Sequence, residues 1–238
     1  MDGFDVSTAP QAYLDIKWIP DLFAAMMGLG WSINYIGMVQ ASFRDHTYGM
    51  AIIPLCNNIG WEIVYVFVHP SKSIVERTAF FTGLSLNVGV MYAAIRFSPA
   101  EWGHAPLVEK NLLSIFLVGI IACFTGHLAL AAEIGPSLAY SWGAVICQIL
   151  LSVGGLGQLL ARNDTRGGSY TLWLGRFLGS CCTVVFASIR YLYWPEAFSW
   201  LASPLLMWSL AAFFLADTTY GVCFYLIKES ESQGSKRN

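Results

Sequence analysis

Seven stretches of almost uninterrupted apolar residues alternate with short polar segments along this chain. Each stretch is roughly 18 to 25 residues long, the length that a helix needs to cross a hydrocarbon core of about 30 Å. The pattern therefore predicts an all-α polytopic membrane protein, a bundle of seven transmembrane helices. The predicted spans are 19–39, 48–68, 78–97, 112–132, 138–160, 171–193 and 203–227.

The polar segments between the spans are too short to hold a soluble domain. We therefore expect a single seven-helix transmembrane domain over residues 1–228. The polar segment 229–238 is expected to be a disordered cytoplasmic tail. The first span lacks the basic leader of a cleaved signal peptide, so we treat it as part of the fold.

Composition supports the membrane assignment. Hydrophobic residues make up 56% of the chain and charged residues 12%, and the mean hydropathy is +0.56. A soluble domain carries about 25% charged residues. The six cysteines fall mostly inside apolar spans and form no CxxC motif, so we expect small core side chains and not disulfides or metal ligands.

The distribution of basic residues predicts the orientation in the membrane. Seven spans place the two termini on opposite sides. The side with the first, third and fifth connections and the C-terminus carries eight Lys and Arg residues, and the other side carries three. The C-terminus is therefore expected in the cytoplasm and the N-terminus in the lumen or outside. The eight are Arg44, Arg96, Lys110, Arg162, Arg166, Lys228, Lys236 and Arg237, and the three are Lys17, Lys72 and Arg77.

Two carboxylates, Glu62 and Asp217, lie in the middle of predicted spans without a Lys or Arg within one helical turn. An acid in hydrocarbon is costly unless it faces a polar cavity or stays protonated, so it marks a functional site by default. The pair indicates proton chemistry inside the membrane.

One face of the second span carries further polar groups. Asn58 and Glu62 are four residues apart and Tyr65 follows three later, with Trp61 beside them. The alternative interpretation is a polar seam that holds helices together through hydrogen bonds. A seam needs only Asn, Ser or Thr, and an ionisable acid favours a site.

The seventh span carries an aromatic stripe around its acid, in which Phe213, Asp217, Tyr220 and Phe224 are spaced by four, three and four residues. Such a stripe is often simple packing. With an acid in it, however, the stripe is typical of a site that creates a cation, since each desolvated ring stabilises a cation by about 0.5 to 2 kcal/mol. An acid kept protonated by desolvation is a usable general acid.

Other polar groups inside the spans leave alternatives open. Arg176 and Arg190, on one face of the sixth span, either extend toward the membrane interface or pair with a buried acid. His127 is either a proton relay or a hydrogen-bonded structural residue. The glycines of 154–157 predict close helix packing and not a phosphate loop.

Several catalytic motifs are missing from the sequence: DDxxD, DxDD, HExxH, GxSxG and the P-loop. Metal-dependent ionisation and serine hydrolysis are therefore disfavoured, and no metal, cofactor or nucleic-acid partner is expected. The seventh span has no lysine to hold a retinal Schiff base.

The segments Asn57–Glu62 and Leu215–Tyr220, together with Trp18–Asp21 and Trp194–Glu196, carry a resemblance over nearly the whole chain. The chain resembles the small fungal membrane-integral terpene cyclases of meroterpenoid and indole-diterpene biosynthesis. The resemblance implies a metal-independent, non-redox enzyme of isomerase or lyase type in the endoplasmic reticulum. The two essential acids of that family match Glu62 and Asp217.

The resemblance further implies that an epoxidised prenyl chain on an aromatic or polyketide head is protonated and cyclises as a carbocation. The branch most similar acts on epoxyfarnesylated dimethylorsellinate-type polyketides. Asn58 is then expected to help hold the donor acid, and Trp61, Tyr65, Phe213 and Tyr220 to surround the cation. The partners are this lipophilic substrate and the lipid bilayer.

Two other functions compete with a cyclase. A proton-coupled transporter uses the same kind of acid pair, but the sequence lacks the internal repeat with paired broken helices that carriers commonly show. A purely structural scaffold has no need of buried acids.

Overall fold

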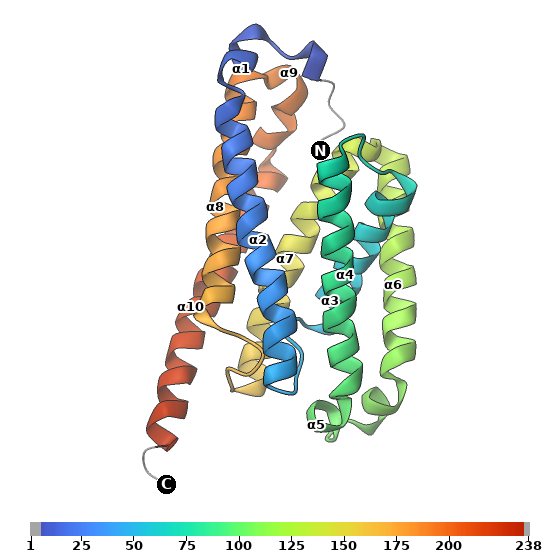
Figure 1. The fold of residues 1–238 in the computed structure, drawn as a ribbon, viewed down its shortest axis with the longest axis vertical. Coiled ribbons are helices and arrows are strands. Elements are labelled where there is room, and N and C mark those ends of the chain that lie inside the picture. Colours follow the sequence, from blue (N-terminus) through green and yellow to red (C-terminus); the bar gives the residue numbers. More distant parts are fainter. Residues whose placement is uncertain (1–5, 236–238) are drawn as a thin grey trace.

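The computed structural model describes residues 6–235, and all regular structure in that range is helical (Figure 1). Six helices are long and apolar enough to cross a membrane. Short helical segments connect or flank them. The long helices are α2 (Trp18–Arg44), α4 (Ile74–Arg96), α6 (Pro106–Ile134), α7 (Pro136–Arg162), α8 (Tyr170–Tyr193) and α10 (Pro204–Ser235). The short segments are η1 (Val6–Thr8), α1 (Gln11–Ile16), α5 (Ser98–Trp102), α9 (Pro195–Phe198) and η3 (Ser199–Ala202).

The second predicted span, 48–68, is shorter in the structure. It consists of α3 (Ile52–Ile63) and the π-helical η2 (Val64–Val68). The helix begins late because Pro54 lacks an N–H and is tolerated in a first turn, where that N–H has no partner within the helix. The prediction of seven spans is thus confirmed for six helices, with the seventh a shorter apolar helix.

The helices form two groups joined by α7. In Figure 1, α2, α8 and α10 stand on one side, α3, α4 and α6 stand on the other, and α7 runs between them. The most extensive packing joins α2 to α8, α3 to α6 and α7 to α10, and α3 also packs on α7. The two groups meet where α3 packs on α7 and also where α2 packs on α4.

Close contact between α2 and α8 depends on glycines. A Cβ atom placed on Gly30 would lie 2.6 Å from the carbonyl oxygen of Gly175 and 3.1 Å from Cα of Gly179. One turn along, Asn34 donates a hydrogen bond to the carbonyl oxygen of Leu172 at 2.8 Å. Small residues and an amide thus hold these helices together, as is common in membranes.

The distribution of side chains suits a hydrocarbon environment. Large apolar side chains are exposed around the bundle, whereas polar side chains are buried inside it. Exposed examples are Leu22, Leu29, Phe81, Leu113, Leu117, Leu178, Met207 and Leu215. Buried polar examples are Asn34, Asn58, Glu62, Asn87, Ser152, Arg176 and Asp217.

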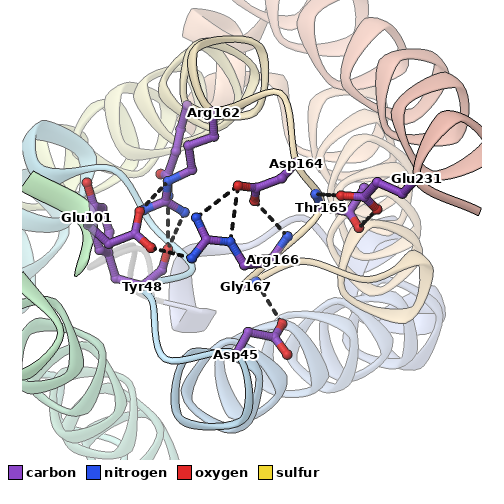
Figure 2. A network of polar contacts seen from close by, with 10 residues as sticks. Asp45, Tyr48, Glu101, Arg162, Asp164, Thr165, Arg166, Gly167 and Glu231 are labelled. Atoms are coloured by element: carbon purple, nitrogen blue, oxygen red, sulfur yellow. Dashed lines mark hydrogen bonds and ion pairs between the residues drawn. The ribbon is translucent and has the colours of Figure 1, made fainter. Parts of the chain in front are cut away.

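One end of the bundle is fastened by a polar network, which Figure 2 shows. Glu101 in α5 accepts Arg162 Nε at 3.2 Å and Arg166 Nη1 at 2.9 Å. The backbone N–H of Gly167 donates to Asp45 at 2.9 Å. The first, third and fifth connections therefore meet at one end, as the alternating path of the chain predicts.

The predicted disordered tail is wrong for the part that the structure describes. Helix α10 continues through Ser235, beyond the expected boundary at 229. The reason is a tertiary contact, since Glu231 accepts hydrogen bonds from the N–H and hydroxyl of Thr165 at 2.9 and 2.7 Å (Figure 2). Residues 236–238 lie outside the described residues.

Candidate active site

Glu62 projects from α3 into the interior with 4% of its surface exposed. The side-chain nitrogen of Asn87, on α4, donates to both carboxyl oxygens, at 2.8 and 2.9 Å. No Lys, Arg or His among residues 6–235 forms an ion pair with this carboxyl group. Glu62 is thus an acid with a neutral donor and no counter-charge.

Asp217, on α10, is fully buried and has a charged partner. Arg176 of α8 donates from Nε to Oδ1 at 2.8 Å, and its Nη2 contacts the same oxygen. The hydroxyl of Ser152 on α7 also donates to Oδ1, at 3.2 Å. The second carboxyl oxygen, Oδ2, has no hydrogen-bond partner among the residues that the structure describes. All stabilising contacts of this carboxylate therefore converge on one oxygen.

The phenol of Tyr35, on α2, is a further polar group of the interior. Its oxygen accepts a hydrogen bond from Asn58 Nδ2 at 2.9 Å. It lies within electrostatic range of Glu62 and of Arg176, the partner of Asp217.

Asn58 does not contact Glu62 through a described hydrogen bond, although both are buried on α3. Its amide bonds to Tyr35 and lies 3.8 Å from the sulfur of Met50. The amide that hydrogen-bonds to Glu62 is that of Asn87. Helical spacing identified a shared face, but the partner of Glu62 comes from another helix.

Trp61 of α3 and Tyr65 of η2 belong to an aromatic cluster. The Trp61 ring lies 5.1 Å from Phe80 and 5.2 Å from Tyr140, and Tyr65 lies 5.0 Å from Tyr140. Their polar atoms bond to α7, since Trp61 donates to the Tyr140 carbonyl and Tyr65 to the Pro136 carbonyl. The cluster fixes α3 against the start of α7.

The aromatic residues of α10 lie beside the ion pair. The guanidinium of Arg176 sits 5.1 Å from the centre of the Tyr220 ring, which stacks on Phe224 at 5.9 Å. Phe213, one turn before Asp217, is 2% exposed and contacts Phe214 edge to face at 4.9 Å. Arg176, for which pairing with a buried acid was one of two predicted alternatives, lies over one face of the Tyr220 ring.

The structure shows the contacts of the other polar residues inside the spans. Arg176 pairs with the buried acid, and Arg190 lies over Phe186 at 4.9 Å and Phe198 at 5.5 Å. His127 Nε2 lies 3.2 Å from Asn57 Oδ1, on a side of α3 that faces α6 and α7, which supports the structural role.

Sequence reasoning missed three residues of the site: Tyr35, Asn87 and Ser152. A buried amide in an otherwise apolar span was the available signal for Asn87. Serine offers little signal, because its hydroxyl is often satisfied by the carbonyl oxygen one turn earlier in its own helix.

The structure has six helices of spanning length and two buried acids with different partners. Together these features define an integral membrane protein with a polar site inside the membrane. Comparison with known proteins specifies it further. The profile of the Pyr4-like transmembrane terpene cyclases matches residues 4–230. The chain therefore belongs to this family of transmembrane terpene cyclases.

Curated relatives cover almost the full chain. Terpene cyclase janB of Penicillium janthinellum is 66% identical over 231 residues, which is 97% of this chain and 95% of the relative. Terpene cyclase penB of Penicillium crustosum is 63% identical over the same shares. Terpene cyclase terB of Tolypocladium album is 61% identical over 100% of this chain and 99% of its own. No solved structure matches the chain.

Proposed function

We propose that this protein is a metal-independent cyclase that protonates the terminal epoxide of an epoxyprenylated aromatic polyketide. The opened cation then cyclises through the alkenes of the prenyl chain, and the last cation loses a proton to give a neutral isomer of the substrate. The observation that carries the proposal is the unequal pairing of the two buried acids, since Arg176 contacts Asp217 and no cation among the described residues contacts Glu62. Two acids with such different partners are suited to different roles.

Glu62 is the proposed general acid. Burial without a counter-charge favours the neutral carboxyl form, which carries a transferable proton. Its proton passes to the epoxide oxygen, and the carbon–oxygen bond breaks to give an alcohol and a tertiary cation. Asn87 is the residue that orients this carboxyl group, because it contacts both oxygens.

Asp217 is the proposed counter-charge. The Arg176 guanidinium and the Ser152 hydroxyl both donate to its Oδ1. The unpaired oxygen Oδ2 leaves negative charge available to a developing cation. A fixed charge in a water-excluded site acts strongly because nothing must reorganise during the reaction.

A membrane location suits the proposed substrate. A prenylated aromatic molecule partitions into the bilayer with about 0.8 kcal/mol per buried CH₂ group, so an enzyme inside the bilayer meets it directly. We place the protein in the endoplasmic reticulum with its C-terminus in the cytoplasm. In this arrangement α3 and η2 together cross the membrane once, in addition to the six long helices. Protease access to a C-terminal tag in sealed microsomes tests this orientation, and a protected tag contradicts it.

Family membership favours the cyclase over the transporter. The two functions also differ in what they require of the membrane. A transporter moves an unchanged solute into sealed vesicles, whereas a cyclase converts its substrate in open membrane fragments.

Product analysis by mass spectrometry in open fragments tests the function. Membranes with this protein are given an epoxyfarnesylated dimethylorsellinate-type ester, with an epoxyprenyl indole as the second head group and empty membranes as the control. An isomer of unchanged mass from the polyketide supports the proposal. An isomer from the indole alone overturns the polyketide head group, and no isomer from either overturns epoxide-initiated cyclisation.

A further inference from the structure

Gly83 of α4 lies against the carboxyl group of Glu62. A Cβ atom placed on Gly83 would lie 2.9 Å from Glu62 Oε1 and 3.8 Å from its Cδ. No other atom of the packed neighbours that the structure describes lies within 4 Å of that point. Real Cβ atoms essentially never approach another heavy atom to less than 3.0 Å. A side chain at position 83 and the observed place of Glu62 Oε1 therefore exclude each other.

This glycine differs from those at the helix contacts. A Cβ atom on Gly30 would meet the backbone of α8, and one on Gly60 would lie 2.7 Å from the backbone nitrogen of Phe124 on α6. Those two glycines let helices approach closely. At Gly83 the obstacle is the end of a side chain, although glycine makes a helix interior less stable than alanine does. The room at Gly83 is thus occupied by a carboxyl group and not by another helix.

One face of α4 surrounds the acid. The Phe80 ring lies 5.1 Å from the ring of Trp61, the residue before Glu62. Gly83 follows Phe80 by three residues and Asn87 follows by seven, so the three lie on nearly the same face of the helix. The side-chain nitrogen of Asn87 donates to both carboxyl oxygens of Glu62, at 2.8 and 2.9 Å. This face of α4 therefore combines a ring contact with α3, a gap and a hydrogen-bond donor.

We propose that Gly83 is a positioning residue for Glu62. Its missing side chain leaves room for Oε1 against α4, and the Asn87 amide binds both oxygens. Together they fix the direction in which the carboxyl group presents its proton. This inference rests on the proposed function, in which Glu62 is the general acid, and it adds a steric requirement at position 83.

A methyl group at position 83 moves the acid and little else. The contact with Oε1 must widen from 2.9 Å to 3.4 Å, where ordinary van der Waals contact begins, which displaces the carboxyl group by about 0.5 Å. The end of a flexible side chain moves this far at little cost, so the fold is kept. A misplacement of about 1 Å at a reacting group costs about 10²-fold in rate, and half of that displacement predicts a roughly tenfold loss.

Gly83→Ala is the test variant. Gly126→Ala is the matched control, because a Cβ atom on Gly126 of α6 meets nothing within 4 Å. The first measurement needs no substrate. It is the infrared spectrum of each protein in lipid vesicles, in which the carboxyl band of Glu62 is identified by its loss in Glu62→Gln. The second measurement is kcat and KM for cyclisation, and the third is the thermal midpoint in detergent.

We expect the Glu62 band to shift in Gly83→Ala and to stay in place in Gly126→Ala, because a displaced carboxyl group changes its hydrogen bonds to Asn87. The kcat of Gly83→Ala is expected to fall roughly tenfold, with KM and the thermal midpoint close to those of the wild type. An unshifted band in Gly83→Ala overturns the positioning role, as does a kcat equal to that of Gly126→Ala.

A second variant covers the case in which Gly83→Ala lowers the thermal midpoint. Glu62→Asp shortens the side chain by one methylene group and withdraws the carboxyl group from position 83. The double variant Gly83→Ala, Glu62→Asp then recovers the midpoint, and absence of recovery overturns the assignment to Glu62. If no substrate is cyclised, the proposed function fails, whereas the infrared shift still decides whether position 83 orients this acid.

Discussion

Asp217 and Arg176 form a buried ion pair in the interior. Removal of one member of a buried pair leaves an uncompensated charge, at a cost of about 3 to 5 kcal/mol. We therefore predict that Arg176→Gln lowers the thermal midpoint in detergent, and that the double variant Arg176→Gln, Asp217→Asn recovers much of the loss without regaining activity. A single variant as stable as the double variant contradicts the ion pair.

Asn87 permits a second test at the scale of the residue. Asn87→Leu removes both hydrogen bonds to Glu62 with little change in volume. We expect kcat to fall by roughly tenfold or more while KM changes little, because an unoriented acid is a poor proton donor. Asn111→Leu is the control, since Asn111 is exposed on α6 and bonds only to Leu107 of its own helix. Equal kcat in the two variants argues against the orienting role.

At the scale of the element, α2 and α8 are held together by glycine contact. Gly30→Ala forces a Cβ atom against the backbone of Gly175, whereas a Cβ atom on Gly28 meets nothing within 4 Å. We predict that Gly30→Ala destabilises the protein by roughly 1 to 3 kcal/mol. Gly28→Ala, in contrast, is neutral or stabilising because alanine favours the helix. Chemical denaturation in mild detergent compares the stability of the two variants. A Gly28→Ala variant less stable than Gly30→Ala would contradict the glycine contact.

The helices themselves were largely predictable from the sequence, because hydrocarbon demands long apolar runs with internal hydrogen bonds. The predicted span 48–68 was too long at its start, where Pro54 delays α3 to Ile52. Both acids were found by their isolation in apolar sequence. Their partners were not, since Asn87 and Ser152 lie on other helices and only the tertiary fold brings them to Glu62 and Asp217.

At the scale of the whole molecule, the network around Glu101 joins connections that are distant in sequence (Figure 2). Glu101→Gln leaves Arg162, whose side chain is 12% exposed, without its carboxylate. We predict that the free energy of unfolding falls by roughly 1 to 3 kcal/mol and that proteolysis between α7 and α8 becomes faster. Limited proteolysis of open membranes is the measurement, with Glu109→Gln on α6 as the control. Cleavage of the two variants at the same rate contradicts a fastening role.

The interior of the bundle holds two buried acids with different partners. In the proposed function, Glu62 delivers the proton and Asp217 is the counter-charge for the cation that results.

Mass-resolved product analysis of membranes that carry Glu62→Gln, Asp217→Asn or the exposed control Glu133→Gln tests the central claim most directly. With an epoxyprenylated aromatic substrate, the account predicts a cyclised isomer from the wild type and from Glu133→Gln. It predicts none from Glu62→Gln and a loss of roughly 10²-fold or more from Asp217→Asn, with all variants inserted normally. Cyclised product from Glu62→Gln at the wild-type rate would contradict the account.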